Sequence, residues 1–320
     1  MSKSDAVIVL GMHRSGTSAI SGELSKLGCF MGRKLFKAQS GVNEKGFFEN
    51  SEIVKINEYV FDTLRSSWDD PLFHITTGQT SLNQGLEKYK DRAVQLIKSE
   101  YKSQPFWGMK DPRTSILIDF WQSVFNCLDM HPKYIVMVRH PAEVYMSLRK
   151  RDSFSVDKAL ILWVCYTLYS LKYYNESDYA IVTFETLMDP KSQVVANTLD
   201  KLFPGNTIDK PETASFITAS LKNNEGDFDL LTDGDVRLVE ITRQLYTCVT
   251  GGNVNPDEIQ LIGNAYADYL NTLSVVLREH LSVVKNSEVT YRNLFDAAYY
   301  SYWWKATWPL RFLENAFKRN

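Results

Sequence analysis

Residues 7–19, VIVLGMHRSGTSA, combine a strand, a loop and the start of a helix. The run Ala6–Leu10 is apolar and rich in valine and isoleucine, which is typical of a strand covered on both faces at the centre of a parallel sheet. From Ser15 to Leu27 the apolar residues recur with helical spacing, and Gly28 is placed to end that helix. Because phosphate groups bind where such a loop opens a helix, the stretch predicts an anion-binding site.

The same order of strand and helix recurs along the chain. Apolar patterns predict strands at 106–110, 134–138 and 179–183, and helices at 114–125, 142–151 and 190–203. Pro141 suits the first turn of the second of these helices. Strands that alternate with helices predict parallel βαβ units, so the expected fold class is α/β, with a central parallel sheet flanked by helices.

The predicted sheet ends before the C-terminal third of the chain. Residues 1–203 form the expected core, and 204–320 a helical cover belonging to the same domain, with helices at 235–248 and 256–281. This second part is expected on the side of the core where a substrate binds, or at a membrane surface. The most apolar run, 159–171, is shorter than the roughly 20 residues that cross a bilayer, which predicts a buried helix.

Charge, the N-terminal segment and the cysteine spacing argue against several kinds of protein. The 320 residues include 36 Lys and Arg against 38 Asp and Glu, a formal charge of −2, which argues against a nucleic-acid-binding coat. The N-terminus, MSKSD, leads directly into the first predicted strand, which favours a cytoplasmic location. Four widely spaced cysteines without a CxxC pair predict neither a metal site nor a disulfide framework: Cys29, Cys127, Cys165 and Cys248.

The loop has the glycine spacing of a nucleoside triphosphatase loop without its lysine. Gly11 and Gly16 are separated by four residues, and Thr17 stands where the lysine belongs. That lysine neutralises the β- and γ-phosphates in phosphoryl transfer. Its replacement weakens the interpretation as a small-molecule kinase with an altered loop, which stays an alternative.

A cation and several small polar residues occupy the loop instead. Arg14 is followed by Ser15, Gly16, Thr17 and Ser18, whose amides and hydroxyls are expected at a helix N-terminus. Such a group can bind one 5′-phosphate without a metal ion. The simpler interpretation is a turn that only connects a strand to a helix.

Two motifs together indicate a family. HRSGTS at 13–18 resembles the 5′-phosphosulfate loop of sulfotransferases that use 3′-phosphoadenosine 5′-phosphosulfate (PAPS). That family also has a strand ending in arginine with a serine eight residues later, as in YIVMVRHPAEVYMS at 134–147, with Arg139 and Ser147. Arg139 can offer a forked pair of donors to the 3′-phosphate, and Ser147 a hydroxyl.

The resemblance implies a P-loop-like sulfotransferase fold, PAPS as sulfate donor, and adenosine 3′,5′-bisphosphate (PAP) as product. A third segment, VTFETL at 182–187, resembles the late strand of the family and implies that Phe184 contacts the adenine; packing in the core is the other interpretation. The implied cofactor-binding residues are Arg14, Ser15, Gly16, Thr17, Ser18, Arg139, Ser147 and Phe184. The resemblance extends over about the first two-thirds of the chain, and no family landmark follows Phe203.

Sulfuryl transfer requires a cation for the leaving phosphate and a base for the acceptor proton. Arg14 is the favoured cation by its place in the loop. Lys110, in WGMKDPR at 107–113, is the second candidate cation, because it ends a predicted strand and the ends of parallel strands face the ligand crevice. Cytosolic relatives have a histidine two residues after such a lysine, where this chain has Pro112, which puts a histidine base in doubt.

The predicted base is Glu49. It lies in NEKGFFEN at 43–50, which resembles the segment that supplies a glutamate base in carbohydrate and tyrosine sulfotransferases. The alternative for Glu49 is a first-turn carboxylate that only complements a helix dipole. Asp111 is the second candidate base, although its neighbours also suit a structural ion pair. His13 could donate to a sulfuryl oxygen.

The remaining expectations concern the acceptor and the C-terminal tail of the chain. The segments GMHRSGTSA, NEKGFFEN and KDPR together resemble microbial sulfotransferases that act on sugar hydroxyls, which implies a carbohydrate, glycan or glycolipid acceptor. The aromatic tail at 299–312, with basic residues nearby, suggests peripheral contact with a membrane, or else packing on the helical cover or in a sugar cleft. A nucleotide-binding module without catalytic activity stays the non-enzymatic alternative.

Overall fold

The computed structural model describes residues 5–36, 46–74, 85–189, 191–205, 226–252, 254–302 and 307, with the side chains of 274–289 and 292 left out. The chain has two compact units, Met1–Tyr269 and Leu270–Asn320. The predicted boundary after residue 203 therefore falls within the first unit.

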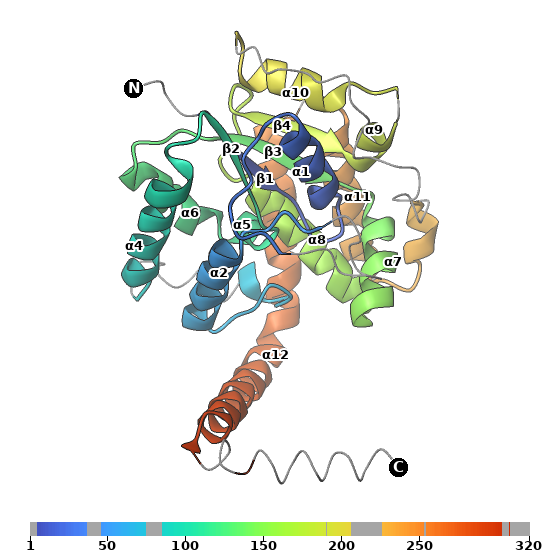
Figure 1. Ribbon diagram of the computed structural model, residues 1–320. Helices are drawn as coiled ribbons and strands as arrows, with labels where there is room; N and C mark the ends of the chain where they lie inside the picture. Colours follow the sequence, from blue (N-terminus) through green and yellow to red (C-terminus); the bar gives the residue numbers. More distant parts are fainter. Residues whose placement is uncertain are drawn as a thin grey trace, which may run out of the picture. The chain divides into compact units, whose positions relative to one another are not determined.

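A four-stranded parallel sheet lies at the centre of the first unit (Figure 1). The strands are β1 (Asp5–Leu10), β2 (Phe106–Lys110), β3 (Lys133–Val138) and β4 (Tyr179–Thr183). Their order is β2-β1-β3-β4, with Val9 opposite both Lys110 and Ile135. The central place predicted for the first strand is confirmed, and so is the α/β class. Since all strands are parallel, the loops that follow them meet at one edge of the sheet.

Helices connect and cover the strands. The first half contains α1 (Thr17–Lys26), α2 (Ser51–Leu64), α4 (Glu87–Leu96) with a π-helical turn at Ile97–Tyr101, α5 (Arg113–Ile116) and α6 (Ile118–Cys127). The second half contains α7 (Pro141–Asp152), α8 (Val156–Ser170), α9 (Phe184–Met188), α10 (Val194–Leu202), a 3₁₀ turn at Phe228–Leu231, α11 (Val236–Thr250) and α12 (Pro256–Tyr299).

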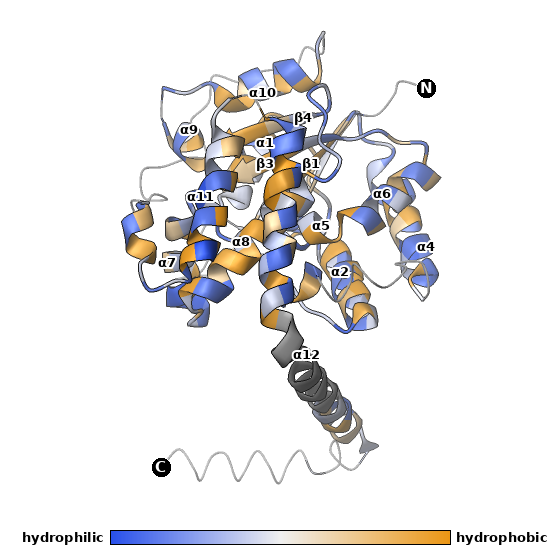
Figure 2. Cartoon of the chain, turned by 180° about the vertical axis from the view of Figure 1, so that it is seen from behind, coloured by the Kyte–Doolittle hydropathy of each residue, from blue (hydrophilic) through white to orange (hydrophobic). Residues whose placement is uncertain are grey.

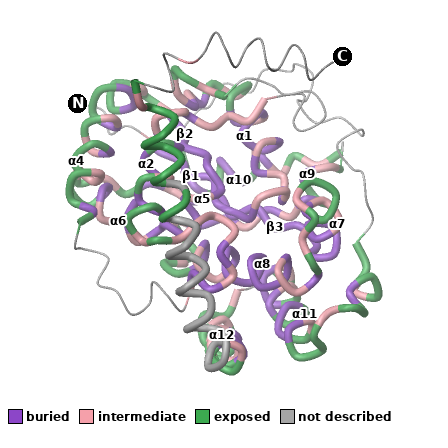
Figure 3. The backbone as a smooth tube through the Cα atoms, turned by 90° about the horizontal axis from the view of Figure 1, so that it is seen from below, coloured by how far each residue is buried: buried purple, intermediate pink, exposed green. Residues whose placement is uncertain are grey.

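The core forms on both sides of the sheet. One sheet face carries alternate strand residues that pack against α1 and α10: Val7, Val9, Ile135, Met137, Ala180 and Val182. Helix α8 is buried along most of its length, as predicted for the apolar run 159–171. Figure 3 shows the buried strands and α8 inside, with exposed positions on the outer helix α4. In Figure 2 the outer helix α2 carries both polar and apolar residues, as an amphipathic helix does.

Three helices differ from their predicted ranges. The helix expected at 114–125 is divided into α5 and α6 at Leu117, whose φ of −98° and ψ of 21° are not helical. Helix α10 begins at Val194, because Asp189 and Ser192 accept hydrogen bonds from backbone amides in a turn before it; Pro190 lies outside the described residues. Helix α12 continues to Tyr299, since no Gly or Pro interrupts the sequence from 264 to 308.

The chain returns to the sheet edge after α1. The amide of Phe30 donates to the carbonyl of Phe106 at 3.1 Å, and the amide of Gly108 donates to the carbonyl of Phe30 at 3.0 Å. A side chain at Gly108 would come within 2.8 Å of two sulfur atoms, those of Cys29 and Met31. A glycine at this place in β2 therefore allows the close approach. Among the described residues, no helix has the length and hydropathy to cross a membrane.

Candidate functional site

The loop between β1 and α1 is held by close contacts on two sides. A Cβ at Gly11, where φ is 136°, would lie 2.5 Å from the carbonyl oxygen of Met137 in β3. A Cβ at Gly16, where φ is 93°, would lie 2.6 Å from Cδ2 of Phe184. Arg14 also has a positive φ, of 70°, which is uncommon for a residue with a side chain. Such strained backbone is concentrated at functional sites.

The N-terminus of α1 opens directly from this loop. Gly16 is the N-cap, and no side chain caps the helix. The first amides of a helix have no partner within it and carry partial positive charge, which suits an anion. Ser15 and Thr17 are buried beside these amides, whereas Ser18 is half-buried. The expected hydroxyls are therefore present at the helix N-terminus, with only Ser18 partly open to solvent.

Lys110 links three parts of the predicted site. Its Nζ donates to Ser18 Oγ at 3.0 Å, to the carbonyl of Phe47 at 3.0 Å and to Glu49 Oε1 at 2.6 Å. The lysine side chain is 2% exposed. A cation at the end of β2 thus joins the anion loop to the predicted base, although 61 residues separate Lys110 from Glu49.

Glu49 is placed just outside helix α2. Its backbone carbonyl accepts from the amide of Phe36, and Asn50 is the N-cap of α2. The acidic residue in the first turn is Glu52, so Glu49 is not the first-turn carboxylate of the alternative interpretation. Burial raises the pKa of the Glu49 carboxyl above its usual value, and the charge of Asp111 adds to this, whereas Lys110 opposes it.

Asp111 is fully buried and already bonded. Its Oδ1 accepts from the amide and the guanidinium of Arg113, both at 3.0 Å, and its Oδ2 accepts from Asn57 Nδ2 at 2.9 Å. Asn57 in turn accepts from Trp121 Nε1 at 2.8 Å. Arg113 also lies 2.6 Å from Glu58 and 3.8 Å from Glu49. Asp111 is thus paired with Arg113, which lies beside Glu49.

The two predicted phosphate motifs meet in space. Arg14 Nε donates to Ser147 Oγ at 2.8 Å, and Arg139 Nη1 donates to the carbonyl of Arg14 at 3.2 Å. The residues at the ends of these contacts are 133 and 125 positions apart in the sequence. The loop after β1 and the loop after β3 therefore form one hydrogen-bonded cluster.

Arg139 makes several contacts within the protein. Its Nε pairs with Glu143, and its guanidinium lies 4.0 Å above the ring of Phe184. Nε and Nη1 of Arg139 therefore each make a hydrogen bond within the protein. Its Nη2 is buried without a hydrogen-bond partner. Phe184 itself is 3% exposed and packs between Arg139 and Gly16.

His13 lies against an aromatic cluster beside the loop. Its ring centroid is 4.5 Å from that of Trp68 and 5.8 Å from that of Tyr166. Burial lowers the pKa of His13 well below its usual value, and the charge of Arg113 adds to this. His13 is therefore neutral at pH 7, and its Nε2 is buried without a partner.

The sequence interpretation missed Glu143 and Ser115. Glu143 stands four residues after Arg139, a spacing that is a readable sign of an ion pair on a helix. Ser115 Oγ accepts from the amide of Gly11 at 2.8 Å and so anchors the loop. Nothing in the sequence around Ser115 indicates that contact, because the two residues are 104 positions apart.

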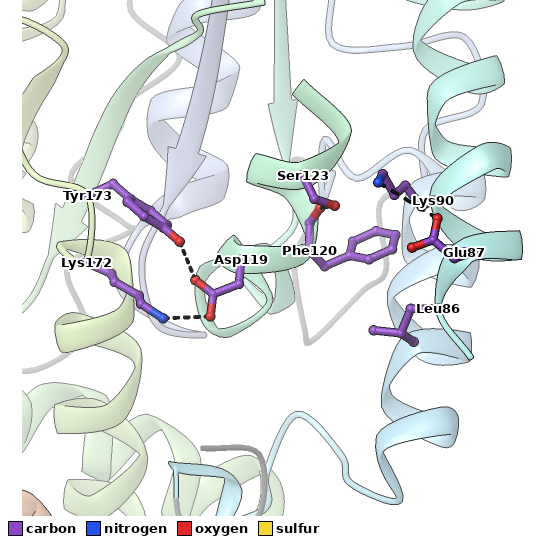
Figure 4. Close-up of a pocket in the computed structure, with 8 residues that line it drawn as sticks. All are labelled: Leu86, Glu87, Lys90, Asp119, Phe120, Ser123, Lys172 and Tyr173. Atoms are coloured by element: carbon purple, nitrogen blue, oxygen red, sulfur yellow. Dashed lines mark hydrogen bonds and ion pairs between the residues drawn. The ribbon is translucent and has the colours of Figure 1, made fainter. Parts of the chain in front are cut away.

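A cavity of about 300 Å³ lies apart from this cluster (Figure 4). At the wall of this cavity, Asp119 accepts hydrogen bonds from Lys172 Nζ at 2.7 Å and from the hydroxyl of Tyr173 at 2.8 Å. The remaining lining residues are Leu86, Glu87, Lys90, Phe120 and Ser123. None of the predicted site residues lines this cavity.

Comparisons with known proteins give a distant likeness. No protein-family model matches the chain, and no curated protein matches its sequence. The sulfotransferase domain from the Synechococcus PCC 7002 olefin synthase is 18% identical, with a TM-score of 0.42, over 82% of this chain and 95% of that one. A sulfotransferase domain from the curacin biosynthetic pathway is 13% identical, with a TM-score of 0.39, over 83% of this chain and 99% of that one. A sulfotransferase from Alicyclobacillus acidocaldarius is 14% identical, with a TM-score of 0.40, over 79% of this chain and 98% of that one.

Proposed function

We propose that this chain is a PAPS-dependent sulfotransferase that moves a sulfuryl group to a hydroxyl acceptor. The observation that carries the proposal is Lys110, whose ammonium contacts both Ser18 at the anion loop and Glu49. Sulfuryl transfer needs an anion site, a cation and a carboxylate base, and a candidate for each belongs to one hydrogen-bonded cluster.

The residues around the loop fit the two phosphate groups of the donor. Arg14 and residues 15–18 would hold the 5′-phosphosulfate at the N-terminus of α1, where the partial charge is positive. Arg139 and Ser147 would hold the 3′-phosphate, which the buried and unpartnered Nη2 of Arg139 supports. Contact of Phe184 with the adenine stays a prediction. When bound, PAPS supplies a sulfuryl group on a phosphate leaving group.

The side chains divide the chemistry between them. Glu49 accepts the proton of the acceptor hydroxyl, and its raised pKa brings it closer to the operating pH of a general base. Lys110 and Arg14 stabilise the charge that develops on the leaving phosphate, so the proposed reaction needs no metal ion. Asp111, the second candidate base, positions Arg113.

Calorimetric titration tests the nucleotide site. We expect the protein to bind PAP in the presence of a chelator, because protein cations supply the charge in this proposal. ATP with Mg²⁺, titrated separately, should bind weakly or not at all. Incubation with PAPS and a panel of sugar acceptors then tests for transfer of labelled sulfate.

The titrations and the transfer assay together decide among the alternative functions. Binding of ATP with Mg²⁺ alone would favour the kinase with an altered loop. Tight binding of PAP without transfer to any acceptor, in a protein whose Glu49 is intact, would favour the nucleotide-binding module.

We propose a carbohydrate or glycolipid hydroxyl as the acceptor. The similarity of GMHRSGTSA, NEKGFFEN and KDPR to microbial enzymes that act on sugars supports this class. Residues 204–320 are proposed to form a helical part on the acceptor side. A cytoplasmic location stays a prediction.

Peripheral membrane contact is proposed for the end of the chain. Tyr299, Tyr300 and Tyr302, at the end of α12 and just after it, are 46–91% exposed. Residues 291–320 contain five Lys and Arg against two Asp and Glu, and many tyrosines and tryptophans, a composition suited to the surface of an anionic bilayer. Most of the tail at 299–312 lies outside the described residues.

Co-sedimentation with vesicles of neutral and anionic lipid tests this contact. We expect the full chain to sediment with anionic vesicles, and a chain ending at Asp296 to stay in the supernatant. Equal sedimentation of both chains would eliminate the membrane proposal.

A further inference from the structure

The side chain of Arg139 is fixed from three directions. Its Nε pairs with Glu143, its Nη1 donates to the carbonyl of Arg14 at 3.2 Å, and its guanidinium lies 4.0 Å from the ring centroid of Phe184. The arginine side chain is 8% exposed and that of Glu143 is 3% exposed. Of the three guanidinium nitrogens, Nη2 is the one that is buried without a hydrogen-bond partner.

We infer that Glu143 is a positioning residue that aims Nη2 of Arg139 at the 3′-phosphate and thereby makes the site specific for nucleotides that carry this group. The inference rests on the proposed function. Glu143 is the third residue of α7, where a carboxylate is also stabilised by the helix dipole. It holds the arginine through a charge-assisted hydrogen bond, the strongest class of hydrogen bond between side chains.

Without Glu143, the arginine loses the contact that fixes its Nε. The carbonyl of Arg14 would then be its one remaining hydrogen-bond partner among the contacts described above. A guanidinium free to rotate must be ordered again when the phosphate binds, and this ordering opposes binding. The effect is expected for ligands with a 3′-phosphate and not for those without one, because Arg139 is proposed to contact the 3′-phosphate whereas the amides at the N-terminus of α1 are proposed to contact the 5′-phosphate.

Titration with PAP and with adenosine 5′-monophosphate tests the inference. In Glu143→Ala, we expect the affinity for PAP to fall about tenfold while that for the monophosphate changes less than about twofold. In Glu143→Gln, whose amide oxygen can still accept from Nε, the loss for PAP should stay within about threefold. Glu52→Ala is the matched control, since it removes a paired first-turn glutamate from α2.

A double-mutant cycle separates positioning from a general structural role. If Glu143 acts through Arg139, adding Glu143→Ala to Arg139→Ala should not weaken PAP binding any further. Equal losses for PAP and the monophosphate in Glu143→Ala, or additive losses in the cycle, would overturn the inference. Failure of the unmodified protein to bind PAP would instead overturn the proposed function.

Discussion

Glu49, whose carboxylate contacts Lys110, can be tested as the general base by substitution. In Glu49→Ala, we expect turnover to fall by about 10² to 10⁴, because the acceptor proton loses its base, whereas PAP affinity should persist. Labelled-sulfate transfer and calorimetry measure the two quantities. Glu87→Ala is a control that removes an exposed glutamate from another helix.

The pH dependence of kcat/KM reports on the same carboxyl. Burial raises the pKa of Glu49, so the acidic limb of the profile should lie above the ordinary value of 4.5. Unchanged turnover in Glu49→Ala would remove this residue from the mechanism and return Asp111 to consideration.

His13 predicts a dependence of stability on pH. Its pKa is lowered in the folded protein, mainly by burial, so the unfolded chain binds more protons just below pH 6.5. The free energy of unfolding should therefore fall as the pH decreases through this range. His74 and His140 shift in the same direction, also through burial, and contribute to the slope.

Urea unfolding of His13→Asn between pH 5 and pH 7 isolates the His13 contribution. We expect the slope to decrease by at most about 1.4 kcal/mol per pH unit, the value for one proton. A slope identical to that of the unmodified protein would show that His13 titrates normally.

At the scale of elements, the turn from β1 into α1 depends on Gly16. We expect Gly16→Ala to abolish most PAP binding, because the added Cβ would meet the Phe184 ring at 2.6 Å and displace the loop. Gly28→Ala is the matched control, since Gly28 also has a positive φ, of 84°, but nothing lies within 4 Å of its added Cβ. It should lower stability by about 1–2 kcal/mol and leave PAP affinity unchanged. Calorimetry and urea unfolding of both variants check this, and equal PAP affinities would contradict it.

The sequence predicted the strands better than the helix ends. β2 and β4 begin and end where expected, because short apolar runs bounded by polar residues allow few alternatives. The break at Leu117 was not predicted, since an apolar residue within a periodic pattern carries no mark of a break. The start of α10 depends on the side chains of Asp189 and Ser192, which compete with helical hydrogen bonds.

The predicted site residues could be named from motifs, but their mutual contacts could not. The bond from Arg14 to Ser147 requires that α7 lie beside the loop after β1. The sequence predicted roles for Arg14, Arg139 and Ser147 but not the hydrogen bonds among them, because motif spacing says nothing about which donors neighbouring residues already occupy.

At the scale of the whole molecule, every predicted site residue belongs to the unit Met1–Tyr269. The chain that ends at Asp296 should therefore bind PAP as tightly as the full chain, whatever its behaviour with vesicles. Calorimetry on both chains tests this, and a large loss of affinity would show that residues after Asp296 contribute to nucleotide binding.

The pairing of Phe30 with β2 also affects how copies of the protein can associate. β2 ends the order of the sheet, and an exposed edge strand is a template on which another chain can add. The two hydrogen bonds to Phe30 occupy backbone groups at the middle of that edge. The chain leaving α1 thus shields β2 from intermolecular strand addition, a route to aggregation.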